Sequence, residues 1–244
     1  MSTLLLRLAA PMQSWGDESK FTTRRTLREP TKSGVVGLLG AAMGIRREQD
    51  EEIARLNRAL RMGVRVDQEG EVRTDFHMVK DFKRANNKGE IRYEKDGAPM
   101  PNNGYVTYRD YLHDAVFLVG LESEDTALLQ SLAAALMRPA FALYLGRRSC
   151  PPTLPLLLGV RECALEDALR AEPWQAAKHL KRRGMPKAGL RLLIEEKPGT
   201  VAQARQRDVP LSFNPQHRRH GFRALQQEQR VLLEANEHDA MAEL

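Results

Sequence analysis

The chain has 244 residues, 42% of them hydrophobic, which is enough for one large or two small domains with a real core. Lysines and arginines outnumber aspartates and glutamates by 38 to 32, a mild form of the basic surplus of nucleic-acid-binding proteins. The longest apolar run, residues 35–45, is too short to cross a bilayer, which excludes a membrane-spanning helix. With no signal peptide and no zinc-type cysteine spacing, we expect a soluble, cytoplasmic protein without metal or cofactor.

Residues 3–10 and 31–44 predict the strand and the helix around which the chain is organised. The strand is an apolar run followed by a proline, and the helix can be capped by Thr31 or Ser33 and ended by Gly44. Glycine recurs at every third position of this helix, so one side carries almost no side-chain volume. We expect that side to pack closely on a sheet. The glycines are Gly34, Gly37 and Gly40.

A polar passage, residues 12–29, separates this strand from this helix, and we expect a functional surface there. It contributes Gln13, Trp15 and the adjacent arginines Arg24 and Arg25. A tryptophan beside a glycine can stack on a base or fill the core, and both interpretations of Trp15 stay open. Basic residues gather here and in several later segments, which indicates a basic face on the molecule.

The periodicity of the following residues predicts a mixed α and β fold. Amphipathic stretches predict two more helices, at 48–60 and 126–137. Alternating or β-branched runs predict strands at 63–67, 72–79, 105–109, 115–121 and 141–145. The order strand, helix, strand, strand, helix, strand is the pattern of ferredoxin-like domains, which often bind single-stranded RNA. After residue 155 the pattern weakens to short helices near 165 and at 174–183, a strand at 190–195 and a basic segment at 205–223.

Residues 80–103 do not resemble core. They contain two turn signals, at 86–89 and 96–97, many basic side chains and few apolar ones. Their composition is compatible with disorder. The alternation at 91–93, between the two turns, instead favours a projecting β-hairpin.

Two patterns raise the question of catalysis. The run of Thr31, Lys32 and Ser33 lacks the glycine spacing of a phosphate-binding loop, so nucleotide hydrolysis is not expected. A second set can provide acid and base for metal-independent RNA cleavage, and it consists of His77, Lys80, Tyr108 and His113. We favour a binding or structural role for His77 and keep cleavage as the alternative.

Five motifs, in the same order along the chain, resemble one known family. They are residues 6–16, 30–39, 75–77, 108–115 and 144–151. Together they are similar to the CasD family of RAMP proteins, which belong to the type I-E CRISPR surveillance complex, Cascade. The match covers about the first two-thirds of the chain, and the last third resembles the family only loosely.

The resemblance implies a fold and a function. It implies an α+β protein with a ferredoxin-like (RRM/RAMP) βαββαβ domain at 1–150, an inserted β-hairpin thumb at about 80–107 and a smaller C-terminal subdomain at 151–244. It implies a non-catalytic subunit that holds the five-prime handle of the crRNA, because a different subunit, CasE, cuts the repeat. The implied partners are the crRNA, the backbone subunit CasC, the large subunit CasA, the subunits CasB and CasE, and target DNA through the complex.

The residues that we expect to contact RNA combine basic side chains, small polar groups and aromatic rings. Arg147 and Arg148 leave a tight turn in different directions, so we expect one to meet phosphate and the other a carboxylate or a neighbouring subunit. The full set is Gln13, Trp15, Arg24, Arg25, Thr31, Lys32, Ser33, Gly34, His77, Lys80, Lys83, Arg84, Arg109, Tyr144, Arg147 and Arg148.

Overall fold

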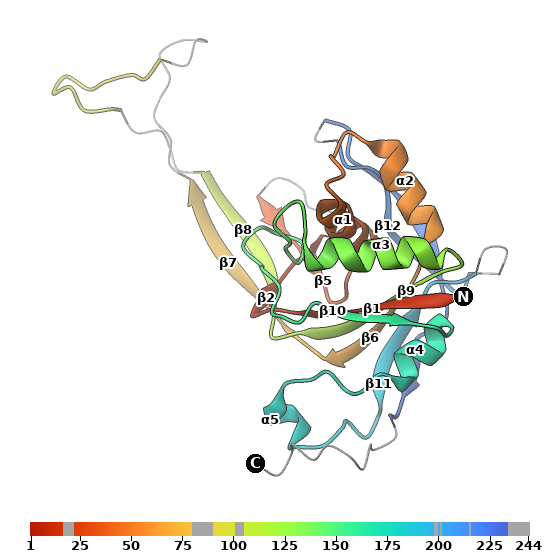
Figure 1. Ribbon diagram of the computed structural model, residues 1–244. Helices are drawn as coiled ribbons and strands as arrows, with labels where there is room; N and C mark the ends of the chain where they lie inside the picture. Colours follow the sequence, from red (N-terminus) through yellow and green to blue (C-terminus); the bar gives the residue numbers. More distant parts are fainter. Residues whose placement is uncertain are drawn as a thin grey trace.

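The first strand, β1 (Ser2–Ala9), lies inside a six-stranded sheet in which every pair of neighbouring strands is antiparallel. The coordinates are a computed structural model that describes residues 1–16, 22–79, 90–100, 105–197, 200, 202–214 and 216–233. The strand order is β10 (Leu157–Arg161), β1, β9 (Val116–Ser123), β6 (Arg61–Gln68), β11 (Leu190–Ile194) and β14 (Gln229–Val231). Figure 1 shows this sheet running through the middle of the molecule.

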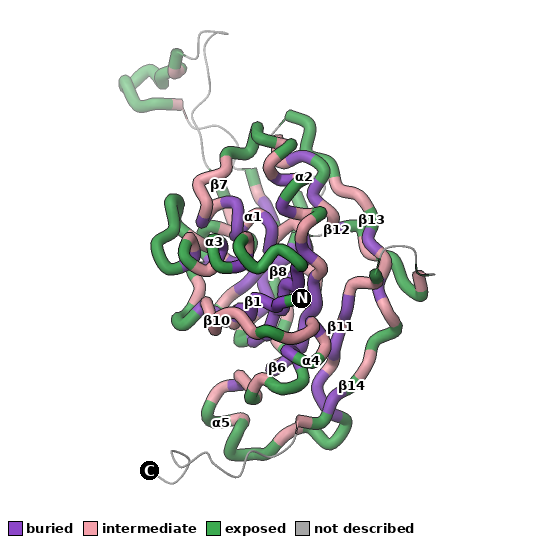
Figure 2. Tube along the Cα trace, turned by 45° about the vertical axis from the view of Figure 1, so that its right-hand side comes forward, coloured by how far each residue is buried: buried purple, intermediate pink, exposed green. Residues whose placement is uncertain are grey.

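Both faces of the central strands are covered. Leu4, Leu6 and Leu8 enter the main core, which includes residues of three helices, α1 (Lys32–Met43), α2 (Asp50–Ala59) and α3 (Thr126–Met137). The intervening Leu5 points the other way, into a smaller core with helix α4 (Leu165–Ala171). Alternate side chains of a strand leave opposite faces, so a strand covered on both sides must be apolar throughout. Figure 2 shows the burial concentrated along these strands.

Helix α1 begins and ends where the sequence predicts. The Thr31 hydroxyl accepts a hydrogen bond from the Gly34 backbone N–H at 3.1 Å, and Gly44 ends the helix in the left-handed conformation, with φ of 78°. The expectation that the glycine side packs on a sheet is wrong. It is Val35 and Leu39, among others, that enter the core. A Cβ atom added at Gly37 would meet nothing closer than 3.6 Å.

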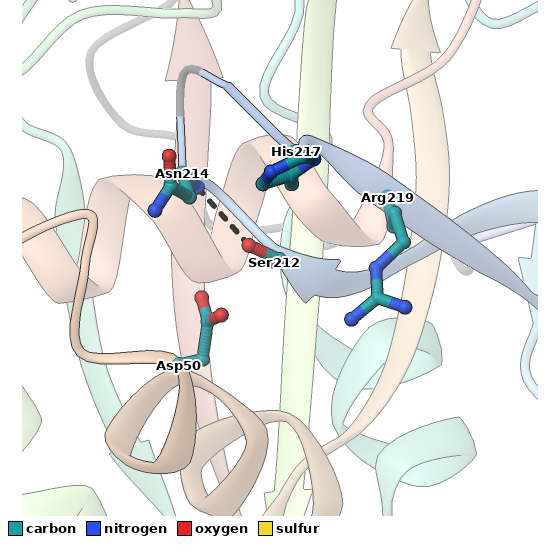
Figure 3. Close-up of a pocket in the computed structure, with 5 residues that line it drawn as sticks. All are labelled: Asp50, Ser212, Asn214, His217 and Arg219. Carbon is teal, nitrogen blue, oxygen red and sulfur yellow. Dashed lines mark hydrogen bonds between the residues drawn. The ribbon is translucent and has the colours of Figure 1, made fainter.

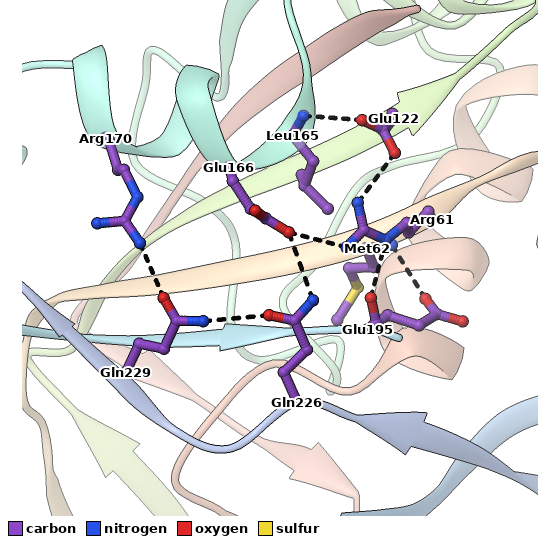
Figure 4. A network of polar contacts seen from close by, with 9 residues as sticks. All are labelled: Arg61, Met62, Glu122, Leu165, Glu166, Arg170, Glu195, Gln226 and Gln229. Carbon is purple, nitrogen blue, oxygen red and sulfur yellow. Dashed lines mark hydrogen bonds and ion pairs between the residues drawn. The ribbon is translucent and has the colours of Figure 1, made fainter. Parts of the chain in front are cut away.

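Arg61, the first residue of the inner strand β6, joins the sheet to helix α4. Its guanidinium donates to Glu122 at 3.1 Å, to Glu166 at 3.0 Å and to the backbone oxygen of Glu195 at 2.8 Å (Figure 4). These partners come from β9, α4 and the end of β11 respectively. A half-buried arginine with carboxylate and carbonyl partners retains full hydrogen bonding, so this junction is well satisfied.

A second, smaller sheet is built on a long antiparallel pair. Strands β7 (Glu71–Val79) and β8 (Tyr105–His113) pair along nine residues each, from Glu71 opposite His113 to Val79 opposite Tyr105. Two short strands, β2 (Met12–Gln13) and β4 (Thr23–Arg24), pair with the other side of β8, and β3 (Trp15–Gly16) pairs with β5 (Thr26–Leu27). The choice between disorder and a hairpin for 80–103 falls largely on residues 80–89 and 101–104, outside the described residues.

The strand predicted at 141–145 is wrong, and β10 takes that place in the sheet. Residues 138–156 form no strand, because their backbone groups bond elsewhere. The Phe141 N–H donates to Ala41 at the end of α1, and the Leu145 carbonyl accepts from Ser14 at 3.1 Å. The turn after this run needs glycine, since a Cβ atom at Gly146 would lie 1.6 Å from the Ser14 oxygen.

The C-terminal third differs most from expectation. Helix α4 and strand β11 lie where they are predicted, but the helix predicted at 174–183 is only α5 (Lys178–Lys181). The basic segment forms an antiparallel pair that was not predicted, β12 (Ala204–Ser212) with β13 (Arg219–Leu225). Strand β12 contacts both α1 and α2. Among the described residues, no helix is both long enough and apolar enough to cross a membrane.

Candidate nucleic-acid interface

A large groove of about 1340 Å³ runs along the glycine side of α1. One wall is the loop from Phe141 to Pro151, and the other includes Phe213, Arg218 and His220 from the β12–β13 hairpin. The segment that joins α1 to α2 closes one end. The groove therefore brings together three stretches of sequence that are far apart in the chain, residues 14–48, 141–151 and 213–220.

The groove is strongly basic. Seven arginines and one glutamate, Glu48, are the fully charged residues among its described lining. The arginines are Arg24, Arg25, Arg46, Arg47, Arg147, Arg148 and Arg218. Like charges gathered in a concave site focus the electrostatic potential and attract an anion, and a polyanion has enough charge to meet all of them. The arginine side chains are long, and each planar guanidinium can donate two hydrogen bonds to one phosphate, so they suit the phosphate groups along a nucleic-acid strand.

The floor of the groove is helix backbone with little side-chain cover. Gly34, Gly37 and Gly40 all line it. Packing within the protein explains the glycine at position 34, because an added Cβ would lie 2.9 Å from the Trp15 ring. Packing does not require glycine at positions 37 and 40, where an added Cβ would lie 3.6 and 3.8 Å from the nearest side-chain atom. Each costs helix stability of about 1 kcal/mol relative to alanine, which points to a ligand that needs close approach.

Aromatic rings stand at the edges of this floor. Phe141 is half exposed on one wall, Tyr144 lies deeper on the same wall, and Phe213 lies over Gly37 on the other. Rings and guanidiniums arranged in this way can stack with nucleobases and bind phosphates at the same time.

Arg147 and Arg148 separate as expected, and within the chain Arg147 binds carbonyl oxygens instead of the predicted carboxylate. Arg147 donates to the backbone oxygens of Asp110 at 2.9 Å and Arg24 at 3.0 Å, and its guanidinium lies 4.6 Å from the Tyr111 ring centre. It therefore holds β8 and β4 to the groove wall through carbonyls and a ring rather than a carboxylate. Arg148 is exposed in the groove and available to a ligand.

Four predicted contact residues are buried instead: Gln13, Trp15, Lys32 and, at the start of α1, Thr31. Gln13 is fully buried, its amide donates to Ala115 at 2.8 Å, and its side-chain oxygen accepts from the Trp15 indole N–H at 3.1 Å. Trp15 is 1% exposed, which favours core filling over base stacking. Lys32 is 3% exposed and ion-paired with Glu195 at 2.7 Å. Burial lowers the pKa of Lys32, against the opposing effect of Glu195. These side chains support the groove from below.

The start of α1 is occupied by a carboxylate of the chain itself. The Lys32 backbone N–H donates to Asp208 at 2.8 Å, and Asp208 is held by two hydrogen bonds from Arg223 at 2.8 and 2.9 Å. The Thr31 hydroxyl already binds the Gly34 N–H. The helix N-terminus thus attracts an anion as expected, but the anion is Asp208 rather than phosphate. Ser33 still lines the groove.

His77 and Arg109 lie on the β7–β8 pair, outside the groove lining. The nearest carboxylate to His77 is Asp75, with 2.9 Å between Nε2 and Oδ2, and Arg109 donates to Thr107 at 3.3 Å. Tyr108 pairs with Phe76, the neighbour of His77, so it leaves the opposite face of the ladder. The predicted contacts Lys80, Lys83 and Arg84 fall outside the described residues.

Comparisons with known proteins identify the family to which this chain belongs. The family model described as CRISPR-associated protein (Cas_Cas5) matches residues 3–226. The chain belongs to this family. A curated relative, the CRISPR system Cascade subunit CasD of Escherichia coli (strain K12), is 36% identical over 179 residues, which cover 70% of this chain and 75% of the relative.

Two solved structures are similar over nearly the whole chain. One, titled "CRISPR RNA-guided surveillance complex", contains a chain 32% identical to this Cas5-family member, with a TM-score of 0.72 and coverage of 95% of this chain and 90% of that one. The other, "Crystal structure of Cas protein", is 37% identical with a TM-score of 0.66 and covers 94% of both chains. The agreement extends through the C-terminal third, where the sequence resemblance is loose.

Sequence reasoning missed several groove residues of this Cas5-family chain. Arg46 and Arg47 follow the glycine-rich helix directly, so their position in the chain was a usable signal. Phe141 was assigned to a buried strand. Arg218 and His220 belong to the basic run at 217–220, for which the sequence leaves contact with duplex DNA or with another subunit open. The place of Phe141, Arg218 and His220 in the groove becomes recognisable in the tertiary arrangement.

We predict that His220 makes stability fall at acid pH. Burial lowers the pKa of His220 below 6.5, and the charges of Arg218 and Arg207 lower it further, against Asp208. The unfolded chain therefore takes up the proton first as the pH falls below about 6.5, which favours unfolding. Denaturant titrations between about pH 7.5 and 5 should show a smaller loss of unfolding free energy in His220→Gln. Identical pH profiles would contradict this assignment.

Proposed function

We propose that this protein is a non-catalytic, crRNA-binding subunit of a Cascade-type CRISPR surveillance complex, and that its arginine-lined groove holds the five-prime handle. The single observation that supports this most is the groove itself, with seven arginines around a floor of bare helix backbone. A relative is named a Cascade subunit, and a similar chain comes from a structure titled as an RNA-guided complex. That complex is named as RNA-guided, and an RNA guide is a polyanion that could fill the groove.

The groove chemistry suits a single strand bent over α1. Exposed arginines such as Arg148 neutralise phosphates, and the bare backbone at Gly37 lets a ribose or a base approach closely. Rings such as Phe141 and Tyr144 offer stacking surfaces. Phosphate contacts and stacking both tolerate any base, so the protein grips the strand without reading most of its sequence. The target itself would be read by base pairing of the guide.

The fold fits this proposal. The strands β10, β1, β9 and β6 stand in the order fourth, first, third, second along the chain, with helices in the two crossovers, as in a ferredoxin-like domain. The fourth strand, β10, lies beyond the expected boundary at residue 150, so we assign residues 1–161 to that domain and 162–244 to a C-terminal subdomain whose β11 and β14 extend the same sheet. The β7–β8 pair would be the base of a thumb that reaches the guide where the handle meets the spacer.

The partners follow from the same assignment. A subunit that fixes one end of the guide is suited to cap the filament of CasC backbone subunits and to dock the large subunit CasA. CasB, CasE and target DNA would join through the assembled complex, in the cytoplasm. The exposed apolar face of the β7–β8 pair, with Phe76, Met78 and Tyr108 each about half exposed, is available for such contacts.

The rival function, metal-independent cleavage of repeat RNA, lacks an assembled acid and base in the described residues. His77 and Tyr108 leave opposite faces of the ladder. His113 shares the face of His77 but pairs with Glu71, six residues away along the strand, which is roughly 20 Å. Groups so placed cannot act on one ribose together.

We predict that incubation with repeat RNA in the absence of divalent metal gives no specific product. Gel electrophoresis of end-labelled RNA measures this directly. The matched variant is His77→Ala, which should retain RNA binding within a few-fold. Specific cleavage that disappears in His77→Ala would establish the rival function.

We predict that three exposed groove arginines each contribute to the salt-dependent affinity. The variant Arg46→Gln, Arg47→Gln and Arg148→Gln should weaken crRNA binding and flatten the plot of log affinity against log salt by about 2 to 3 units of slope. Each lost phosphate contact removes about 0.7 to 0.9 released counterions. Filter binding across a salt series measures the slope. Arg138→Gln, an exposed arginine after α3 and outside the groove, is the control.

We predict that Gly37→Ala stabilises the protein while weakening guide binding. The added Cβ has 3.6 Å to Phe213 and removes a helix glycine, which should raise the unfolding free energy by about 0.5 to 1 kcal/mol. It also raises the groove floor under the RNA. Thermal denaturation and crRNA titration measure the two effects.

Gly34→Ala is the matched control for this prediction. Its Cβ would lie 2.9 Å from Trp15 and from the Thr31 hydroxyl, so this variant should lose stability. A Gly37→Ala protein with unchanged crRNA affinity would show that the RNA does not lie on α1.

A further inference from the structure

A second hollow, of about 360 Å³, lies on the other side of the β12–β13 hairpin from the groove. Its lining comes from the start of α2 and from the hairpin, and consists of Asp50, Ser212, Asn214, His217 and Arg219. Figure 3 shows the Asp50 carboxylate rising from α2 toward Ser212, with the Arg219 guanidinium across from it. Its volume lies at the lower end of the range of small-molecule sites, about 300 to 1000 Å³.

One basic run, residues 217–220, is divided between the two hollows. Arg218 and His220 line the groove, whereas His217 and Arg219 line the second hollow. The α1–α2 segment is shared in the same way. Residues 46–48 line the groove, and Asp50, two residues on, lines the hollow. A strand held in the groove therefore passes within one hairpin's width of the second hollow.

Asp50 has an unmet hydrogen-bonding need. Its Oδ1 is inaccessible to solvent and has no hydrogen-bond partner. Leaving a buried acceptor unpaired costs about 1 to 3 kcal/mol, so such a group calls for an external partner. Rotation about the soft χ2 torsion brings either carboxylate oxygen to the hollow. The ligand must therefore present hydrogen-bond donors to Asp50.

Other polar groups of the hollow are partly used within the hairpin. The Ser212 hydroxyl oxygen accepts from the Asn214 N–H at 3.1 Å and keeps its own proton to donate. The Asn214 side-chain oxygen accepts from the Gln216 N–H at 3.0 Å, which leaves its amide N–H groups. The hollow thus offers one carboxylate acceptor on one side and several donors, Arg219 foremost, on the other.

We propose that this hollow is a base pocket that takes a guanine turned out of the RNA strand in the groove. Guanine alone among the four RNA bases has two adjacent donors, N1–H and the 2-amino group, which match the two oxygens of a carboxylate. Its neighbouring edge has two acceptors, O6 and N7, which an arginine binds. Asp50 and Arg219 supply this pair from opposite sides, and His217 offers a ring for stacking. The inference rests on the proposed RNA-binding function of the groove.

The test compares a short guanine-containing RNA with the same RNA in which every guanine is replaced by inosine. Inosine lacks only the 2-amino group, so the wild-type chain should bind it on the order of tenfold more weakly. In Asp50→Asn, the two RNAs should bind within about twofold of each other. Fluorescence anisotropy with the full chain measures all four affinities, and Arg219→Gln should weaken binding of the guanine RNA.

Glu51→Gln is the matched control, because it removes a carboxylate from the same first turn of α2 but lies exposed outside the hollow. It should preserve the guanine preference. Equal binding of both RNAs to the wild-type chain would overturn the base pocket. If Asp50→Asn also impaired association with another subunit in that case, the hollow would be assigned to a protein partner. Failure of the groove-arginine variants to weaken RNA would instead overturn the proposed function.

Discussion

The pairing of Asp208 with the start of α1 is the interaction on which the groove depends. Asp208 receives the Lys32 backbone N–H and two bonds from Arg223, and all three residues are at least nine-tenths buried. The Lys32 ammonium adds an ion pair to Glu195, at the end of β11. These contacts fix the β12–β13 hairpin against the helix that forms the floor. Breaking one partner of such a network leaves a buried charge without compensation, which is costly.

The network also explains why the C-terminal third cannot be treated as an independent addition. It supplies one wall of the groove through Phe213, Arg218 and His220, and two strands of the main sheet. Charges inside the protein hold this wall, while charges of the same kind on its surface are left for a ligand. The distinction between Arg223, which is buried and paired, and Arg218, which lines the groove, is therefore one of position rather than residue type.

Much of the fold could be predicted from local patterns. The strand β1, helix α1 with both its caps, α2 and α3 have strong periodicity and clear end signals, and they lie where predicted. The strand at 141–145 was wrong because its apolar residues pack on the end of α1 and line a groove, and a short apolar run has the same appearance in either setting. The β12–β13 pair was missed because basic residues on both strands obscure the alternation.

The sequence predicted which segments bring positive charge to the site, but not which of their side chains are exposed and which are buried. Arg24, Arg25 and Arg148 come from segments where a basic face is expected, and they line the groove. Gln13, Trp15 and Lys32 come from the same motifs but turn inward, and only tertiary packing decides that. The glycines were noticed for the right reason, an absence of side chains, but assigned to the wrong neighbour. A bare helix face can serve an internal surface or an external one, and sequence does not distinguish them.

The alternation of His217, Arg218, Arg219 and His220 between two hollows has a consequence for how this hairpin can change over evolutionary time. Inserting or deleting a single residue inside β13, just after Arg219, would shift its register against β12 and send the following side chains to the opposite face of the pair. His220 would then leave the groove. A length change in the loop before β13 leaves this register intact, so we expect variation in length in that loop rather than within the strand.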